Sequence, residues 1–136
     1  MAISFKELLQ GKVLSDVTHT QQLNLEELLR RINTVRAAWG KPMQVTSGLR
    51  TMQDHLRIYA AKGITDRTKI PMASAHLEGM AVDIADPDGS LGHWLKNDPA
   101  GIVALERADL YCENTGGNWQ HFQTRKPKSG NRWFNP

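Results

Sequence analysis

An aspartate in the middle of an alternating strand pattern constrains this chain more than any other feature. In the segment 80–86 the alternation turns Val82 and Ile84 to one face and Asp83 to the other. A carboxylate inside a strand needs a partner, because burying an unpaired charge is costly. The segment therefore predicts a strand with one face on a hydrophobic core and the other on a polar site.

His76 is the nearest candidate partner for that carboxylate. Gly79 lies between the two and gives the backbone the freedom to bring the loop with His76 beside the strand, while Ala81 leaves room under it. Imidazole nitrogen and carboxylate oxygen both suit Zn²⁺, which binds them at about 2.0–2.2 Å. A catalytic zinc site takes three protein ligands and keeps one position open, so a third ligand has to come from elsewhere.

The best third ligand is His121, in the aromatic-rich alternating run 118–123. This run follows the turn signal Gly116-Gly117, and in a strand Trp119 and His121 share one face. A lone histidine in such a run is more often a hydrogen-bonded core residue than a ligand. Three suitable side chains in two strand contexts favour a metal site.

These residues resemble a known family. The pattern Ser-x-His-x-x-Gly-x-Ala-x-Asp, followed downstream by Trp-x-His, is similar to that of the zinc D-alanyl-D-alanine carboxypeptidases and endopeptidases. That family includes many phage endolysins and shares its fold with the Hedgehog signalling domain. The resemblance covers about residues 24–123, and the positions that carry it are Ser74, His76, Gly79, Ala81, Asp83, Trp119 and His121.

The resemblance implies specific roles. The zinc ligands would be His76, Asp83 and His121. Ser47-Gly48-Leu49-Arg50 resembles the family's Ser-Gly-x-Arg element, whose arginine lies in the active site.

From the residues alone, a structural salt bridge is the plainer reading of Arg50. With the resemblance, substrate binding or oxyanion stabilisation is favoured for it. Ser74 and Trp119 are expected to contribute to substrate binding beside the metal.

The catalytic base is where the chain departs from the family. Better-known members carry an acid three residues before the last histidine, and Asn118 occupies that position here. An amide cannot accept and return a proton as a carboxylate does. Glu113, at the far end of the same predicted hairpin, is the replacement we expect, against the alternative of a solvated acid near the turn. Glu78 is assigned to the rim of the site.

Size and composition indicate one globular domain, residues 1–136, with a basic and aromatic C-terminal tail at 124–136. The chain is 40% hydrophobic and 23% charged, which are ordinary globular values. Seventeen basic and fourteen acidic residues leave a mild positive charge, which favours an anionic partner such as cell wall. The single cysteine, Cys112, excludes an internal disulfide and is expected to be a small buried core residue.

The N-terminus shows neither a secretory signal pattern nor a membrane span. We therefore expect synthesis in the cytoplasm without a signal peptide, and action on the cell wall or periplasm after release or from a virion. The expected partner is a peptidoglycan peptide, with no nucleic acid and no membrane, and the chain is expected to be a monomer. The tail could bind a polymer or strap over the core, and both readings stay open.

The pattern predicts an α+β fold, in which a small, mainly antiparallel sheet carries the zinc site on one face and helices on the other. His55 is assigned to a supporting or surface position in one of these helices. The predicted function is zinc-dependent hydrolysis of peptidoglycan stem peptides, and the alternative is an inactive zinc-stabilised wall-binding or virion structural module. Helices are expected near 4–10, 24–39, 51–62, 90–95 and 98–105, and strands near 43–47, 80–86, 108–113 and 118–123.

Overall fold

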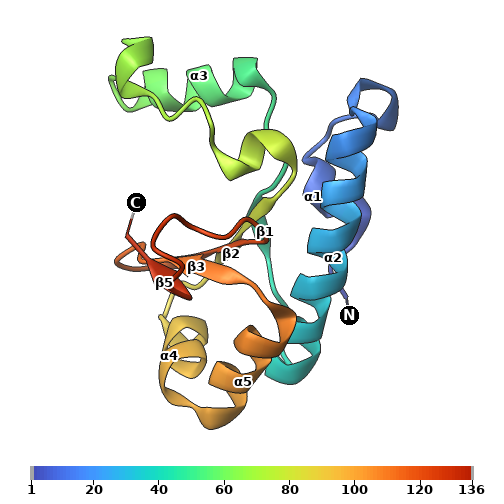
Figure 1. Cartoon of the computed structure of the whole chain (residues 1–136), viewed down its shortest axis with the longest axis vertical. Helices are drawn as coiled ribbons and strands as arrows, with labels where there is room; N and C mark the ends of the chain where they lie inside the picture. The colour runs from blue at the N-terminus through green and yellow to red at the C-terminus, as the bar shows by residue number, and fades with distance from the viewer. Residues whose placement is uncertain (1, 136) are drawn as a thin grey trace.

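Five strands form one mixed sheet in the computed structural model, which describes residues 2–135 (Figure 1). Their order across the sheet is β1-β2-β4-β3-β5. All neighbouring strands are antiparallel except β3 and β5, which run parallel. The predicted α+β fold with a mainly antiparallel sheet is confirmed. The strands are β1 (Val45–Ser47), β2 (Ala81–Ala85), β3 (Tyr111–Glu113), β4 (Trp119–Gln123) and β5 (Trp133–Phe134).

The register of the sheet gathers polar residues on one face. Asp83 on β2 pairs with His121 on β4, which in turn pairs with Glu113 on β3. Ser47 of β1 and Phe134 of β5 extend this row to the two edges of the sheet. Directly paired residues point to the same face, so one row brings two candidate ligands and the candidate base together.

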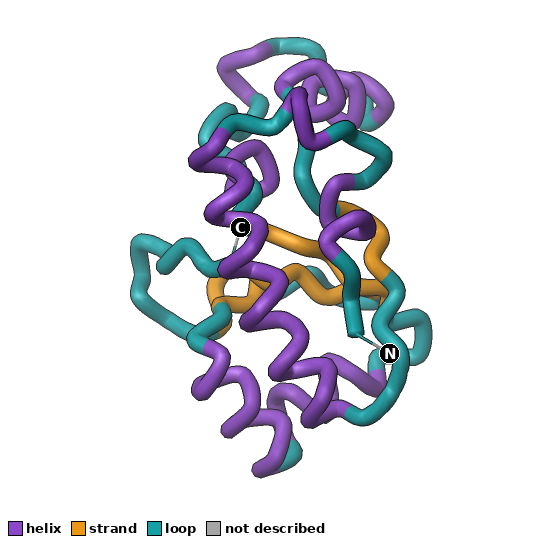
Figure 2. The backbone as a smooth tube through the Cα atoms, turned by 90° about the vertical axis from the view of Figure 1, so that its right-hand side faces the viewer, coloured by secondary structure: helices purple, strands orange, loops and turns teal. Residues whose placement is uncertain are grey.

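The opposite face carries the hydrophobic core. Val82, Ile84, Cys112 and Phe122 are fully buried there, which confirms the alternation seen in the sequence and the buried position of the cysteine. The long helix α2 packs along α5, and α4 packs against both α5 and β4 (Figure 2). These helices are α2 (His19–Trp39), α4 (Ser90–Asn97) and α5 (Pro99–Ala108).

Capping residues set where the helices begin. Ser4 and Glu7 form the expected capping box of α1 (Phe5–Leu9), and Thr51 and Asp54 form that of α3 (Met52–Ala61). The predicted start of α2 at Asn24 is wrong. Thr18 and Gln21 make a capping box further upstream, so the helix begins at His19.

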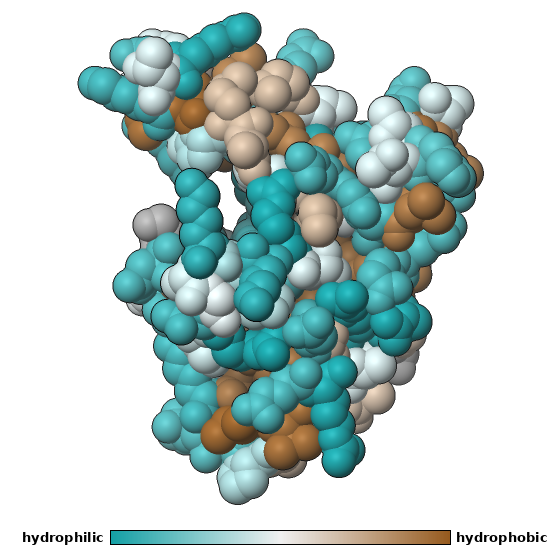
Figure 3. Space-filling view, viewed as in Figure 1, coloured by the Kyte–Doolittle hydropathy of each residue, from teal (hydrophilic) through white to brown (hydrophobic). Residues whose placement is uncertain are grey.

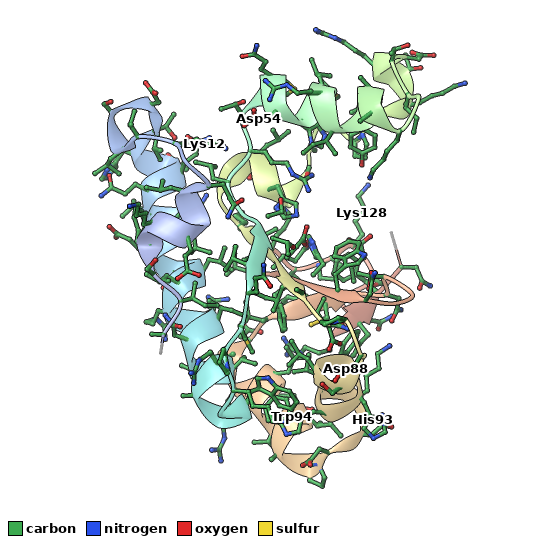
Figure 4. The ribbon with its side chains drawn as sticks, turned by 180° about the vertical axis from the view of Figure 1, so that it is seen from behind. Lys12, Asp54, Asp88, His93, Trp94 and Lys128 are labelled. Carbon is green, nitrogen blue, oxygen red and sulfur yellow. The ribbon has the colours of Figure 1, made fainter. Side chains whose placement is uncertain are left out.

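Helix α3 stands apart from the other helices at one end of the molecule (Figure 1). A salt bridge of 3.0 Å joins Lys12, after α1, to Asp54 near the start of α3 (Figure 4). Three short 3₁₀ helices complete the fold, namely η1 (Leu14–Asp16), η2 (Arg67–Lys69) and η3 (Ala75–Glu78). Within residues 2–135, no helix combines the length and apolar character needed to cross a membrane.

The C-terminal tail is part of the sheet. Cys112 pairs with Trp133 and Glu113 with Phe134, so β5 extends β3 at the edge. The Trp133 side chain also packs against the core. Of the two readings left open for the tail, packing against the core describes its last residues.

Candidate metal centre

Three elements bring the candidate ligands together. His76 comes from η3, Asp83 from β2 and His121 from β4, and all three side chains are buried. Nε2 of His76 lies 3.2 Å from Oδ2 of Asp83, and Nδ1 of His121 lies 2.9 Å from Oδ1 of Asp83. One possible ligand atom from each residue falls within 4.8 Å of the other two, so the cluster can hold a metal ion.

The outer nitrogen of each imidazole is already engaged. Nδ1 of His76 lies 2.9 Å from the carbonyl oxygen of Gly48, which only accepts, so this nitrogen carries the proton. The amide nitrogen of Gln123 donates to the carbonyl of Arg125, which leaves its Oε1 to accept from Nε2 of His121 at 2.8 Å. Nε2 of His76 and Nδ1 of His121 therefore remain as the ligand nitrogens, both turned to Asp83. Such outer hydrogen bonds are typical of histidines that bind zinc.

Electrostatics favour an ionised Asp83. Burial disfavours its charged form, but hydrogen bonds with His121 and His76 outweigh burial and hold the pKa of Asp83 well below its usual range. Burial likewise acts against protonation of His121, yet the contact with Asp83 raises the pKa of His121. The centre thus supplies a negative charge to a cation.

Close backbone packing positions the loop of His76. Ser74 accepts a hydrogen bond from the His76 amide, and Gly79 ends the turn at a φ of 74°. From α2, Gln21 donates to the carbonyl of Leu77 at 3.0 Å. Asn24, predicted to cap that helix, donates instead to the carbonyl of Glu78 at 2.9 Å. The motif turn is therefore fixed to the main core helix.

Gly48 is required by a close approach of two backbone segments. A Cβ at this position would lie 2.3 Å from the carbonyl oxygen of Leu8. The next amide, that of Leu49, donates to the same oxygen at 2.8 Å. This contact fixes the carbonyl of Gly48 that orients His76.

Arg50 joins the same centre. Its amide donates to the carbonyl of His76 at 3.1 Å, and its guanidinium lies 3.7 Å from the Asp83 carboxylate. Its Nε also donates to the hydroxyl of Ser47 at 3.3 Å. The salt bridge expected from the residues alone is therefore present, and the same side chain lines the cleft above the centre.

Glu113 lies beside His121, whereas Asn118 does not face the site. Oε2 of Glu113 is 3.8 Å from Nδ1 of His121, and the side chain is 21% exposed. Asn118 is exposed just before β4 and is not among the residues that line the cleft. The carboxylate nearest to the centre, apart from Asp83, thus comes from the neighbouring strand.

Comparison with known proteins decides the family. The sequence model of the family described as Peptidase M15 matches residues 3–98, which is more than half of the chain. The chain belongs to the Peptidase M15 family. His76 and Asp83 lie inside the matched residues and His121 beyond them. No curated protein and no solved structure gives a match.

The cofactor expected for an M15 peptidase fits the residues present. M15 peptidases are zinc-dependent metallopeptidases, and zinc is the cofactor of this family. Two imidazole nitrogens with fixed outer protons and one buried carboxylate form the donor set that zinc prefers. The predicted cofactor is therefore confirmed at the level of the family.

A cleft of about 860 Å³ opens over the centre of this M15 peptidase. The space-filling view shows a hollow between the end of the molecule that carries α3 and the rest (Figure 3). The structure brings Arg50, Ser74, Glu113 and Trp119 to the wall of the cleft, together with the three candidate ligands.

Two residues that contact His121 were not predicted from the sequence. Gln123 is buried and fixes the orientation of His121, and Phe134 places its ring edge-on to His121 at a centroid distance of 6.1 Å. Gln123 follows His121 by two positions in the strand, so the shared face was a usable signal. Phe134 reaches the site only through the parallel pairing of β5, for which the sequence holds no local signal.

His55 is a buried residue behind the cleft rather than a surface one. Its side chain is fully buried, and Nε2 donates to the carbonyl of Pro71 at 2.7 Å. Nδ1 has no partner among residues 2–135. This contact ties α3 to segment 71–75, which lines the cleft and leads into η3. The surface reading of His55 is wrong, and a supporting position describes it.

Acid should destabilise the protein through His55. Burial, and then the nearby charge of Arg50, lower the pKa of His55 below the ordinary value near 6.5. Below about pH 6.5 His55 therefore binds a proton in the unfolded chain but not in the folded chain. The free energy of unfolding then falls by up to about 1.4 kcal/mol per pH unit. Thermal melts of the zinc-saturated protein from about pH 8 to 5 measure this fall. In His55→Gln the fall should be shallower, and identical slopes in the two proteins would contradict the assignment.

Proposed function

We propose that the protein hydrolyses peptide bonds in the stem peptides of peptidoglycan, as a carboxypeptidase or endopeptidase of the endolysin type. The observation that carries the proposal is the row of Asp83, His121 and Glu113 across three strands, with His76 beside it in an open cleft. Membership of the M15 family supports a metallopeptidase. The protein acts as a monomer on the cell wall, either after release from the cytoplasm or from a virion.

The proposed mechanism assigns one task to each residue. His76, Asp83 and His121 would hold zinc, which would supply a Lewis acid to polarise the scissile carbonyl and to make the attacking water more acidic. Glu113 takes a proton from the attacking water and delivers it to the leaving amine. Arg50 stabilises the negative charge that develops on the carbonyl oxygen.

The walls of the cleft hold the peptide. Ser74 and Trp119 both line the cleft, Ser74 next to the turn of His76 and Trp119 two residues before His121. The aromatic ring offers an apolar surface to the substrate, and the hydroxyl offers a hydrogen bond. These contacts orient the scissile bond over the centre.

The alternative is an inactive module in which zinc only stabilises a wall-binding or virion structural domain. Asn118 favours it, because the acid expected at that position is missing. Glu113 weighs against it, since an inactive module needs no carboxylate 3.8 Å from a ligand nitrogen.

Metal analysis combined with mass spectrometry of digested peptidoglycan tests the proposal. We expect one zinc per chain and new peptide ends after digestion, both lost after zinc is removed by a chelator. One bound zinc without peptide release from any wall preparation would overturn the enzymatic proposal and support the inactive module.

A further inference from the structure

Two lysines face the cleft from separate segments of the chain. Lys62 follows α3 directly, and Lys128 lies in the C-terminal segment before β5. Both are exposed and both line the cleft. Lys128 extends from its segment toward the end of the molecule that carries α3 (Figure 4). The open side of the cleft therefore has a cation on each of two walls.

The two arginines of the cleft lie beside carboxylates, whereas the two lysines have no carboxylate partner in the described part of the chain. Arg50 lies 3.7 Å from Asp83, and Arg125 makes a salt bridge of 2.9 Å with Glu78. Among residues 2–135, neither lysine makes a salt bridge with a carboxylate. The ammonium group of Lys62 lies instead 5.0 Å from the centre of the Tyr59 ring.

The acidic side chains of the cleft lie near the metal centre and do not neutralise the charges of these lysines. Asp83 and Glu113 are the two acidic side chains that line the cleft, and both contact His121. Four cationic side chains line the same space, so its outer part has an excess of positive charge. Such a surface attracts and orients an anionic ligand.

We propose that Lys62 and Lys128 bind a carboxylate of the peptide substrate that is separate from the scissile bond, and so select acidic peptides. The inference rests on the proposed function and adds a specificity element to it. Arg50, deep in the cleft, acts on the reacting carbonyl, whereas the two exposed lysines act on a charge further along the peptide. A lysine ammonium is a compact charge on a long flexible side chain, so it can bind a carboxylate in more than one geometry.

The lysines should affect binding rather than the chemical step. They lie outside the contacts of the metal centre, so removing either charge should raise KM and leave kcat unchanged. An exposed charge pair of this kind corresponds to about a two- to fivefold change in affinity. The effect should weaken at high salt, because exposed charges are screened.

Kinetics on matched stem peptides test the proposal. Each free carboxylate of a synthetic stem peptide is converted singly to an amide, and KM is compared for the wild type, Lys62→Met and Lys128→Met. Lys126→Met is the matched control, since Lys126 is exposed in the same segment but does not line the cleft. For one of the carboxylates, amidation should raise the wild-type KM about two- to fivefold and have little further effect in the lysine variants. Equal effects of the variants on acidic and fully amidated peptides would overturn the proposal.

Binding measurements separate this proposal from the proposed hydrolysis. The same peptides are titrated into zinc-loaded Glu113→Gln protein and into two double variants that add Lys128→Met or Lys128→Arg. Tryptophan fluorescence is the readout. We expect Lys128→Met to weaken binding of the acidic peptide alone, and Lys128→Arg to retain it. A preference of the Glu113→Gln protein for the acidic peptide, together with no hydrolysis of any peptide by the wild type, would retain the lysine site and overturn the peptidase. Hydrolysis by the wild type, together with equal affinity of the Glu113→Gln protein for acidic and amidated peptides, would retain the peptidase and overturn the lysine site.

Discussion

Replacing Glu113 with glutamine is expected to lower kcat by about 10²–10⁴-fold, the usual contribution of a general base, while one zinc per chain is retained. Glutamine keeps the size and polarity of the side chain but cannot accept a proton. Because Oε2 of Glu113 is 3.8 Å from the nitrogen of His121 that faces the centre, it can reach a water there. Release of peptide ends, measured together with zinc content, checks this result.

Two control variants make the Glu113 result specific. Glu78→Gln should retain activity, because Glu78 is an exposed partner of Arg125 and not a cleft base. Adding Asn118→Asp to Glu113→Gln should not restore activity, since Asn118 does not line the cleft. Full activity of Glu113→Gln would show that another group moves the proton. Loss of zinc from it would show that Glu113 acts on the metal centre instead.

Local patterns were enough to predict the part of the fold that carries the centre. The alternation around Asp83 predicted β2, its buried face and its polar face, and each is found in the structure. The two-glycine turn predicted a hairpin that brings Glu113 back to His121, and the two residues are direct cross-strand partners. Strand alternation and turn composition are local properties, so a single sequence is enough to show them.

Features that depend on distant contacts could not be predicted in the same way. Asn24 has the chemistry of a helix cap, but it is used to fix the carbonyl of Glu78, 54 residues away. The pairing of β5 with β3 joins Phe134 to Glu113 without a turn between them, and the short strand carries no alternation of its own. The metal roles of His76, Asp83 and His121, and the catalytic role of Glu113, stay predictions that metal analysis and kinetics have to test.

Replacing Asp83 with asparagine should weaken zinc binding by more than about 100-fold. Loss of a residue that only orients a zinc ligand typically costs 10–100-fold, and Asp83 is expected to be a ligand itself as well as the contact of both imidazoles. Zinc at a free concentration 1,000 times its Kd stabilises a protein by about 4 kcal/mol, which for a domain of this size raises Tm by on the order of 10 °C. At the same zinc concentration Asp83→Asn should show less than half of that rise, with thermal melts as the measurement.

Asp86→Asn is the matched control, because it also removes a buried carboxylate at the end of β2. The Asp86 carboxylate accepts from the amides of Leu91 and Gly92 and from the side chain of Gln120, so its task is to hold the start of α4. An asparagine has a single side-chain oxygen and cannot satisfy all three donors, so Asp86→Asn should melt at a lower temperature with and without zinc. It should nevertheless keep the zinc-induced rise in Tm. If Asp83→Asn also kept the full rise, the loss of a buried carboxylate would have no bearing on zinc, and the ion would have to be bound without Asp83.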